Sequence, residues 1–256
     1  MPPGRVSLFM TCLVDLLYPR VGQAAAALLE DAGVAVDVPP SQTCCGQPAF
    51  NAGFPDDARP VARAFLDAFE GSEVVVSPSG SCTAMVRTYV PHLFEGTSDE
   101  RRARDVAGRT YELSEFLVDV LGREAVPGHW AGRVTYHDSC HGLRELGLRG
   151  QGRRLLSGVE GVELVEMAWP ERCCGFGGMF SVRMPDVATA MADDKVAQAE
   201  ATKADVMVTG DTGCLMHLAG RMRRTGSGPR PMHLATFLAE AGGLLAASAT
   251  GMTSRS

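Results

Sequence analysis

The tripeptide Cys44-Cys45-Gly46 occurs a second time as Cys173-Cys174-Gly175, about 130 residues later, and this repeat predicts how the chain is organised. One cysteine precedes each pair and another follows it, at similar spacings in both halves. The two sets are Cys12, Cys44, Cys45 and Cys82, and Cys140, Cys173, Cys174 and Cys214. No cysteine of the chain is left over. A repeat of this length indicates an internal duplication with four cysteines in each half.

Strands and helices are expected to alternate in both halves. In the first half, the apolar pattern predicts strands at 6–10, 34–38 and 73–77 and helices at 21–31 and 55–69. In the second half, it predicts strands at 133–136, 162–166 and 205–209 and a helix at 186–202. Such alternation is typical of βαβ units around a parallel sheet. The expected fold class is therefore α/β, with two pseudo-symmetric βαβ domains that each contain a parallel sheet.

The duplication also predicts the domain boundaries. We expect a first cysteine-rich domain at 1–125, a second at 126–245 and a small-residue tail at 246–256 that is disordered. Glycine and proline cluster around Trp130, so the hinge between the domains is expected within 122–132.

The expected strands place the cysteines relative to each sheet. In each half, the first cysteine follows the first strand, the adjacent pair follows the second strand, and the last cysteine follows the third. Ligands of open α/β sheets bind at the carboxyl ends of the strands, near the switch point of strand order. We therefore expect the four thiols of each half to meet in one crevice.

Composition excludes several classes of protein. Of the 256 residues, 45% are hydrophobic and 21% charged, as in ordinary globular proteins, and a net charge of -6 gives no reason to expect nucleic acid. Eight cysteines are too few for a disulfide-stabilised secreted scaffold. The sequence shows neither a secretory signal nor the roughly 18–20 apolar residues of a membrane span. We therefore expect a cytoplasmic protein without a transmembrane segment, in which clustered cysteines bind metal or perform redox chemistry.

Four soft thiolates in each half suit zinc, iron or an iron–sulfur cluster, and they suit magnesium or calcium poorly. Structural zinc usually takes paired cysteines at a C-x2-4-C spacing, which this chain lacks. Adjacent cysteines fit two irons of a larger cluster better than one small ion. The alternative is that each pair is simply a buried pair of free thiols, because free cysteine often behaves as a small apolar residue.

Three segments carry a resemblance to known proteins. They are Pro78-Ser79-Gly80-Ser81-Cys82, Tyr136-His137-Asp138-Ser139-Cys140-His141 and Cys173-Cys174-Gly175-Phe176-Gly177-Gly178. With the repeated cysteine spacing, they resemble the cysteine-rich CCG-domain proteins. Those include the B subunit of heterodisulfide reductase, the iron–sulfur subunit of glycolate oxidase and the C subunit of anaerobic glycerol-3-phosphate dehydrogenase. A chain of just two such domains most resembles the lactate-utilization protein A family.

The resemblance implies an iron–sulfur electron-transfer subunit of a cytoplasmic complex that oxidises L-lactate to pyruvate. Its partners would be a ferredoxin-like iron–sulfur subunit and a third small subunit. The alternative substrates are glycolate and glycerol 3-phosphate. The chain itself would be a non-catalytic or co-catalytic oxidoreductase subunit, and no residue is assigned a catalytic role. Carried over by position, the cluster ligands are Cys12, Cys44, Cys45, Cys82, Cys140, Cys173, Cys174 and Cys214.

The chain departs from the fuller family motif at Ser79 and Asp211, which stand where an additional cysteine would give five ligands per site. Five cysteines hold the non-cubane clusters of heterodisulfide reductase. Four thiolates per site instead predict ordinary 4Fe-4S clusters, one or two per chain. Asp211 is expected to hydrogen-bond within its loop, with metal ligation through oxygen as the alternative.

Histidines distinguish the second site from the first. His137 and His141 flank Cys140, and His217 follows Cys214 by three residues. One of them would bind a metal or donate to a cluster sulfur, or all three are packing and capping residues. This asymmetry leaves room for zinc at one site. Two further functions remain open at this point: a heterodisulfide or thiol reductase-type subunit, and a zinc-stabilised assembly module.

Overall fold

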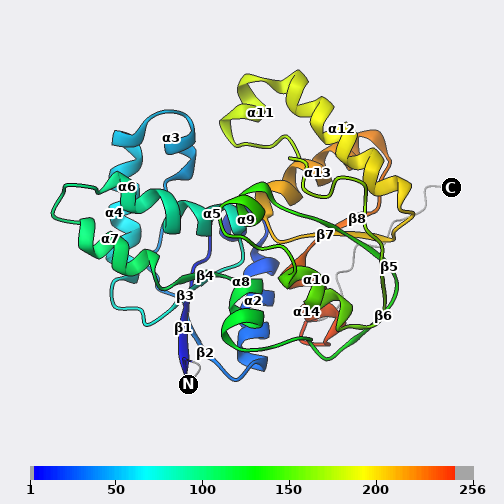
Figure 1. Ribbon diagram of the computed structural model, residues 1–256, viewed down its shortest axis with the longest axis horizontal. Helices are drawn as coiled ribbons and strands as arrows, with labels where there is room; N and C mark the ends of the chain where they lie inside the picture. Colours follow the sequence, from blue (N-terminus) through cyan, green and yellow to red (C-terminus); the bar gives the residue numbers. More distant parts are fainter. Residues whose placement is uncertain (1–2, 246–256) are drawn as a thin grey trace.

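The computed structural model describes residues 3–245, and the expected tail at 246–256 lies outside the described residues. It contains two four-stranded sheets in which every strand pair is parallel, with the orders β2-β1-β3-β4 and β6-β5-β7-β8 (Figure 1). The two sheets therefore have the same topology. The predicted α/β class, with two similar halves built on parallel sheets, is confirmed.

The first half carries one sheet and the helices that connect its strands. Its elements are β1 (Arg5–Leu8), α1 (Cys12–Leu17), α2 (Pro19–Asp31), β2 (Ala35–Asp37), α3 (Gln47–Asn51), α4 (Pro55–Phe69), β3 (Val75–Ser77), α5 (Gly80–Ala84), the π-helix η1 (Met85–Tyr89), α6 (Val90–Leu93), α7 (Glu100–Ala107), β4 (Thr110–Glu112), α8 (Leu113–Glu115) and the π-helix η2 (Phe116–Val120).

The second half repeats this order with fewer helices. Its elements are β5 (His129–His137), α9 (Cys140–Arg144), α10 (Gln151–Ser157), β6 (Glu160–Leu164), α11 (Met179–Arg183), α12 (Pro185–Ala201), β7 (Val206–Thr209), α13 (Thr212–Thr225), β8 (Arg230–His233) and α14 (Leu234–Ala241). Strand β5 begins at His129, inside the segment expected as a hinge. Trp130 is fixed there because its ring packs against Phe237 at 5.3 Å.

The switch point of each sheet lies between its two central strands. Strand β1 pairs with β2 on one side and with β3 on the other, and β5 pairs with β6 and β7 in the same way. Connections leave the two central strands in opposite directions, which opens a crevice beyond their carboxyl ends. Cys12 and Cys82 follow β1 and β3, and Cys140 and Cys214 follow β5 and β7, so the topology brings each set of cysteines to a switch point.

One hydrophobic core joins the two halves. It contains side chains of both sheets and of helices α2, η2, α10 and α14, among them Leu28, Phe116, Leu155 and Phe237, all of them buried. Figure 1 shows α2, α10 and α14 between the two sheets. Full burial of each such side chain contributes about 1.5–3 kcal/mol. The halves are therefore held against each other by apolar packing rather than by a flexible connection.

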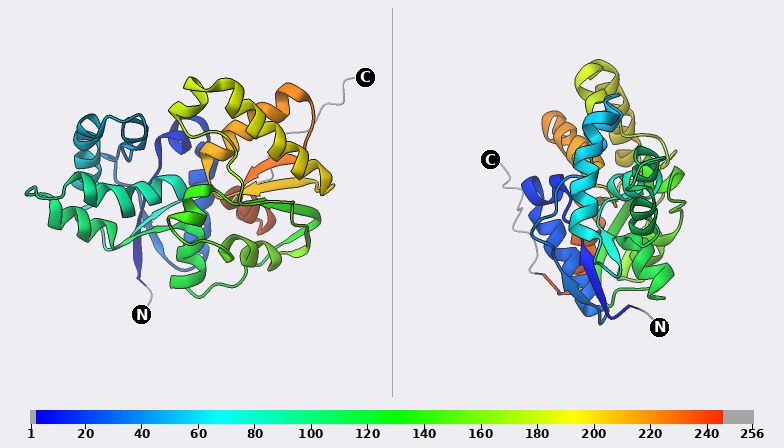
Figure 2. Two further views of the ribbon diagram at one scale, coloured as in Figure 1. Left: turned by 45° about the horizontal axis from the view of Figure 1, so that its top comes forward. Right: turned by 90° about the vertical axis from the view of Figure 1, so that its left-hand side faces the viewer.

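Helices α4 and α12 cover the outer faces of the two sheets. Helix α4 buries Phe65 and Phe69 against Phe9, and α12 occupies the equivalent place in the second half. Figure 2 shows the short helices α3 and α11, with the longer α4 and α12, extending toward the same side of the molecule. Within residues 3–245, no helix combines the length and apolarity that a membrane crossing requires.

Candidate metal centre

All eight cysteines line a single cavity of about 160 Å³ between the two halves. Two crevices, one for each half, were expected from the sequence. The cavity is shared because the carboxyl ends of both sheets converge on it. Helix α3 closes it from the first half through Gln47 and Pro48, and the glycines before α11 close it from the second half.

Each half places its cysteines on the same local elements. The first cysteine of each set, Cys12 or Cys140, begins a helix directly after the central strand, and the last, Cys82 or Cys214, lies in the first turn of the next helix. Backbone N–H groups at these helix starts point outward and favour negative charge. The hydrogen bond to the neighbouring cysteine, together with burial, nevertheless raises the pKa of Cys12 and of Cys140, so these two remain thiols. The adjacent pairs lie in the loops that lead into α3 and α11.

The glycine after each cysteine pair lets the loop pass a helix at close range. Gly46 and Gly175 have φ values of 88° and 92°, in the left-handed region that favours glycine. A Cβ atom would lie 3.2 Å from the carbonyl oxygen of Ala58 at Gly46, and 2.6 Å from that of Ala188 at Gly175. The Cys-Cys-Gly sequence is therefore required by backbone geometry as well as by its thiols.

The thiols interact within each set. The Sγ atoms of Cys12 and Cys44 lie 3.8 Å apart. Hydrogen bonds from Cys12 and Cys45 lower the pKa of Cys44 to about 3, and hydrogen bonds from Cys140 and Cys174 lower the pKa of Cys173 in the same manner. The thiolate is the form of cysteine that binds metal. Each half thus provides one preformed thiolate among three further thiols, a donor set that fits soft metals and iron–sulfur clusters.

Asp211 uses both carboxylate oxygens in hydrogen bonds. Its Oδ1 atom accepts from the N–H groups of Gly213 and Cys214, at 3.0 and 3.3 Å, and so caps α13. Its Oδ2 atom accepts from the Ser81 N–H at 2.8 Å and from the Ser79 hydroxyl at 3.3 Å. The structure therefore shows the loop role expected for Asp211 and extends it across the two halves.

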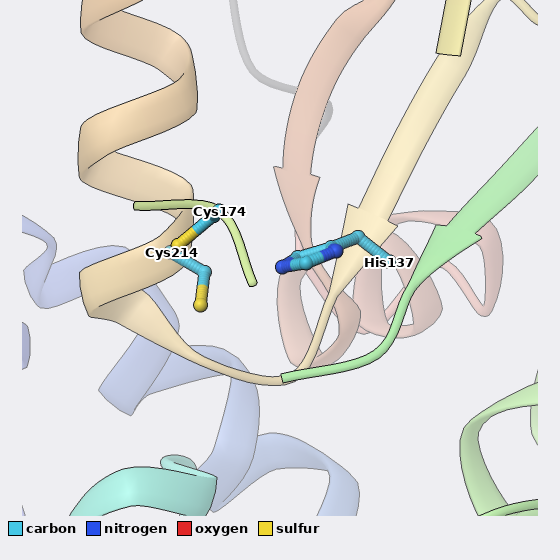
Figure 3. Close-up of side chains that lie close together, drawn as sticks. All are labelled: His137, Cys174 and Cys214. Atoms are coloured by element: carbon cyan, nitrogen blue, oxygen red, sulfur yellow. The ribbon is translucent and has the colours of Figure 1, made fainter. Parts of the chain in front are cut away.

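The three histidines of the second half have different surroundings. His217 places Nε2 at 3.3 Å from the Ala188 carbonyl oxygen, packs beside Phe176 and lines a separate pocket. His141 lines the cysteine cavity, with Nδ1 3.8 Å from Cys140 Sγ. His137 is fully buried, and one of its ring nitrogens lies within 4.8 Å of the sulfurs of Cys174 and Cys214. Figure 3 shows its ring pointing toward these two cysteines.

Burial dominates the chemistry of His137. It lowers the pKa of the ring to about 3, and the nearby Lys195 ammonium acts in the same direction. Neither ring nitrogen has a hydrogen-bond partner within the usual limits among the described residues, although the Pro170 backbone lies beside the ring. An unpaired buried polar group costs about 1–3 kcal/mol. The imidazole therefore lies unpaired beside two potential metal ligands.

Lys195 holds the loop that carries the second cysteine pair. The sequence alone did not predict this role. Lys195 is fully buried on α12, and its Nζ donates to the Trp169 carbonyl oxygen at 2.6 Å. This contact fixes the loop that leads to Cys173 and Cys174. The sequence held one signal, because Lys195 and Lys203 are the only lysines of the chain and Lys195 falls on the apolar side of the expected helix.

Comparisons with known proteins agree with the repeat. The cysteine-rich domain family CCG matches residues 6–87 and 134–219. The chain is 47% identical to "Lactate utilization protein A" of Geobacillus kaustophilus over 235 residues, which are 91% of this chain and 98% of that protein. It is 45% identical to the protein of that name from Oceanobacillus iheyensis, over 91% of this chain and 96% of the relative. It is 43% identical to "Lactate utilization protein A 2" of Bacillus cereus, over 92% and 98%.

A solved structure shares the fold. The crystal structure of a hypothetical protein from Helicobacter pylori superimposes with a TM-score of 0.67 at 10% sequence identity, over 95% of this chain and 50% of that chain. At this identity the similarity concerns the arrangement of sheets and helices alone.

Proposed function

We propose that this chain, which belongs to the lactate utilization protein A family and carries two cysteine-rich CCG domains, is an iron–sulfur electron-transfer subunit. The reaction that it serves in this proposal is the oxidation of L-lactate to pyruvate. A role in lactate utilization follows from relatives that match nearly their whole length. The iron–sulfur chemistry and the assembly with partners are the further steps of the proposal.

The observation that carries the iron–sulfur assignment is the shared cavity lined by all eight cysteines. Each half offers four thiols, enough for one 4Fe-4S cluster held by thiolates alone. The ligands would be Cys12, Cys44, Cys45 and Cys82 in the first half, and Cys140, Cys173, Cys174 and Cys214 in the second. When bound, such clusters supply one-electron transfer.

The residues of the chain position these ligands and lower the charge density on sulfur. The N–H group of Gly175 donates to Cys173 Sγ at 3.4 Å, and helix starts carry Cys12 and Cys140. Hydrogen bonds to sulfur and burial are the means by which a protein sets a cluster potential. The Ser81–Asp211 contact holds the loops of Cys82 and Cys214 side by side, which favours electron exchange between the two sets.

Hydride or carbanion chemistry on lactate is assigned in this proposal to a partner. A ferredoxin-like iron–sulfur subunit and a third small subunit are the proposed partners, and the cytoplasm is the proposed compartment because cysteine ligands must remain reduced. Disulfide-cleaving chemistry ranks lower, since Ser79 and Asp211, at the positions of an additional cysteine, are used as helix caps.

Metal analysis after anaerobic purification tests the cofactor assignment. About eight irons and eight acid-labile sulfides per chain would support two 4Fe-4S clusters. Stoichiometric zinc without sulfide would refute electron transfer and favour a zinc-stabilised assembly module.

Growth of a deletion strain tests the substrate. We expect loss of growth on L-lactate, restored by the wild-type gene and not by a Cys12→Ser variant, with growth on glycolate and glycerol 3-phosphate unchanged. Loss of growth only on one of the latter two would replace lactate as the substrate.

A further inference from the structure

His137 has a counterpart in the first half, and the counterpart is Phe9. The two residues precede Cys12 and Cys140 by the same three positions. They also hold equivalent places in the sheets, because the Phe9 N–H donates to Val76 of β3 and His137 pairs with Thr209 of β7. Both side chains are fully buried. The duplication therefore supplies an internal comparison between a phenyl ring and an imidazole at one site of the fold.

The phenyl ring satisfies this position by packing alone. Phe9 contacts the ring of Phe65 at 4.8 Å and that of Phe69 at 5.5 Å, both edge-on. Helices α4 and α12 each begin at a proline, and matching them from Pro55 and Pro185 places Lys195 at the position of Phe65. The second half has thus replaced two members of an aromatic cluster by a polar pair. Because phenyl rings fill the equivalent space in the first half, packing alone does not require His137 or Lys195 in the second.

An imidazole in this place requires a polar partner. Buried polar groups are almost always hydrogen-bonded, yet neither nitrogen of His137 has a partner among residues 3–245. The Pro170 backbone lies beside one side of the ring. A histidine that binds metal through one nitrogen usually directs the other toward a carbonyl or carboxylate, and Pro170 is placed for that second role.

The other side of the ring faces two thiols. A ring nitrogen and the Sγ atoms of Cys174 and Cys214 all lie within 4.8 Å of one another, and Figure 3 shows the ring directed at both sulfurs. Metal–sulfur bonds of about 2.3 Å and metal–nitrogen bonds of about 2.0 Å place two ligand atoms of a tetrahedral ion roughly 3.5–3.8 Å apart. Closure of about 1 Å would bring these three atoms to the spacing of ligands on one metal ion. The three residues come from the end of β5, the cysteine-pair loop and α13, so they converge from separate elements.

We propose that His137 is a nitrogen ligand of the second metal centre, which is therefore a mixed thiolate–imidazole centre, whereas the first centre is bound by thiolates alone. The inference rests on the proposed function only in that the cysteines hold metal. In a cluster with four ligand positions, His137 takes the place of one of the four second-half cysteines, and replacing a thiolate by a neutral imidazole makes the centre less negative and easier to reduce, as in Rieske centres. The two halves then carry centres of unequal potential, and the second is the electron acceptor of the pair.

Pulsed electron paramagnetic resonance on the reduced, anaerobically purified protein tests the ligand directly. We expect a nitrogen coupling of the strength of a directly bound imidazole that changes when histidine is labelled with ¹⁵N. It should disappear in His137→Phe and persist in His217→Phe, because His217 contacts the Ala188 carbonyl instead. A spectrum without this coupling, or with only the weak coupling of a hydrogen bond, would overturn the proposal, as would a coupling that survives in His137→Phe.

Metal retention gives a second measure. His137→Phe introduces the residue that the first half already uses at this position, so the fold is expected to persist and circular dichroism will check it. In competition with a chelator, the metal affinity of the second centre should fall at least about tenfold, with the first centre unchanged. Equal retention of both centres in a folded His137→Phe protein would contradict the proposal, and the labelled wild-type spectrum decides the question if the variant does not fold.

Failure of this inference is distinguishable from failure of the proposed function. A protein that contains zinc and no iron refutes electron transfer, and X-ray absorption at the zinc edge then examines the same ligand. A nitrogen shell at about 2.0 Å beside sulfur at about 2.3 Å would still support His137. A shell of sulfur alone would refute it.

Discussion

The backbone N–H of Ser81 donates to the carboxylate of Asp211 at 2.8 Å, from one half of the molecule to the other. Ser81 lies in the first turn of α5, next to Cys82, and Asp211 is the N-cap of α13, which carries Cys214. One carboxylate therefore caps two helices that present cysteines to the same cavity.

Asp211→Ala removes both caps at once. Loss of a helix cap, with buried N–H groups left unpaired, costs about 1–3 kcal/mol, and the free energy of unfolding should fall by that amount in urea titration. Ser79→Ala is the matched comparison at the equivalent position, because it removes the 3.4 Å cap of the Cys82 N–H and one hydroxyl contact to Asp211 but leaves the caps of Ser81, Gly213 and Cys214 in place. Equal losses in the two variants would contradict the bridging role of Asp211.

Alanine in place of the glycine of each Cys-Cys-Gly sequence should lower the free energy of unfolding, by more at Gly175 than at Gly46. Gly46→Ala should cost about 1–2 kcal/mol, because an L residue is strained at this φ. Gly175→Ala should cost more and weaken metal retention, because its Cβ would lie 2.6 Å from the Ala188 carbonyl oxygen, closer than the 3.2 Å that separates a Cβ at Gly46 from the Ala58 carbonyl oxygen. Gly53→Ala isolates the strain, since Gly53 has a φ of 89° and open space around it. The free energy of unfolding and the metal content of the three variants check this order.

Serine at the second cysteine of each pair should remove one centre at a time. Cys45→Ser and Cys174→Ser should each retain about half of the bound metal, because the cysteine sets are contributed by separate halves. Electron paramagnetic resonance should then show two different remaining signals. Unchanged metal content and signals in both variants would refute the ligand assignment.

The sequence predicted the repeated framework well because that framework depends on local patterns. Helix α4 runs from Pro55 to Phe69 as predicted, since proline begins it and apolar residues recur along one face. Strands β4 and β8 were missed, because Thr110–Glu112 and Arg230–His233 are short and contain polar residues instead of an apolar run. Edge strands of this kind are defined by their pairing with β3 and β7.

The shared cavity and the special place of His137 depend on contacts between distant residues. A repeat predicts two similar halves but not their relative orientation, which is fixed by the common core and by contacts such as Ser81 with Asp211. The sequence likewise treated His137, His141 and His217 alike. Only the fold separates the buried, unpaired ring from the two that have other neighbours.

Arg153→Met should destabilise the second half strongly. Its guanidinium binds both carboxylate oxygens of the buried Asp138, at 2.8 and 2.9 Å, and lies 5.0 Å from the Tyr136 ring centroid. Removing one partner of a buried pair leaves a charge without compensation, at a cost of about 3 kcal/mol. Arg172→Met is the control, because its pair with Asp194 is half exposed and should be worth less than about 1 kcal/mol. Urea titration should separate the two variants, and equal effects would contradict this account.

Glu112 should make stability depend on pH. Burial raises the pKa of this carboxyl to about 7 from an ordinary value of 4.5, despite hydrogen bonds from Ser114 and the Glu115 N–H that favour the charged form. The folded state therefore holds the proton more tightly than the unfolded chain. The resulting stabilisation is complete below about pH 4.5 and is lost as the pH rises through 7. At 1.36 kcal/mol per pKa unit, the loss is on the order of 3 kcal/mol.

Glu112→Gln keeps a neutral side chain at this position at every pH. Buried His137 and His233, whose pKa values are lowered to about 3 and about 4, change stability with pH in the opposite direction, so the difference between wild type and variant is the quantity that reports Glu112. From pH 5 to pH 8 the wild type should lose roughly 2–3 kcal/mol of free energy of unfolding relative to Glu112→Gln, as measured by urea titration at both values. Glu163→Gln is the control, because this carboxyl is exposed on β6 and its removal should leave the pH profile of the wild type unchanged. A difference between wild type and Glu112→Gln that stays constant from pH 5 to pH 8 would refute the role of Glu112.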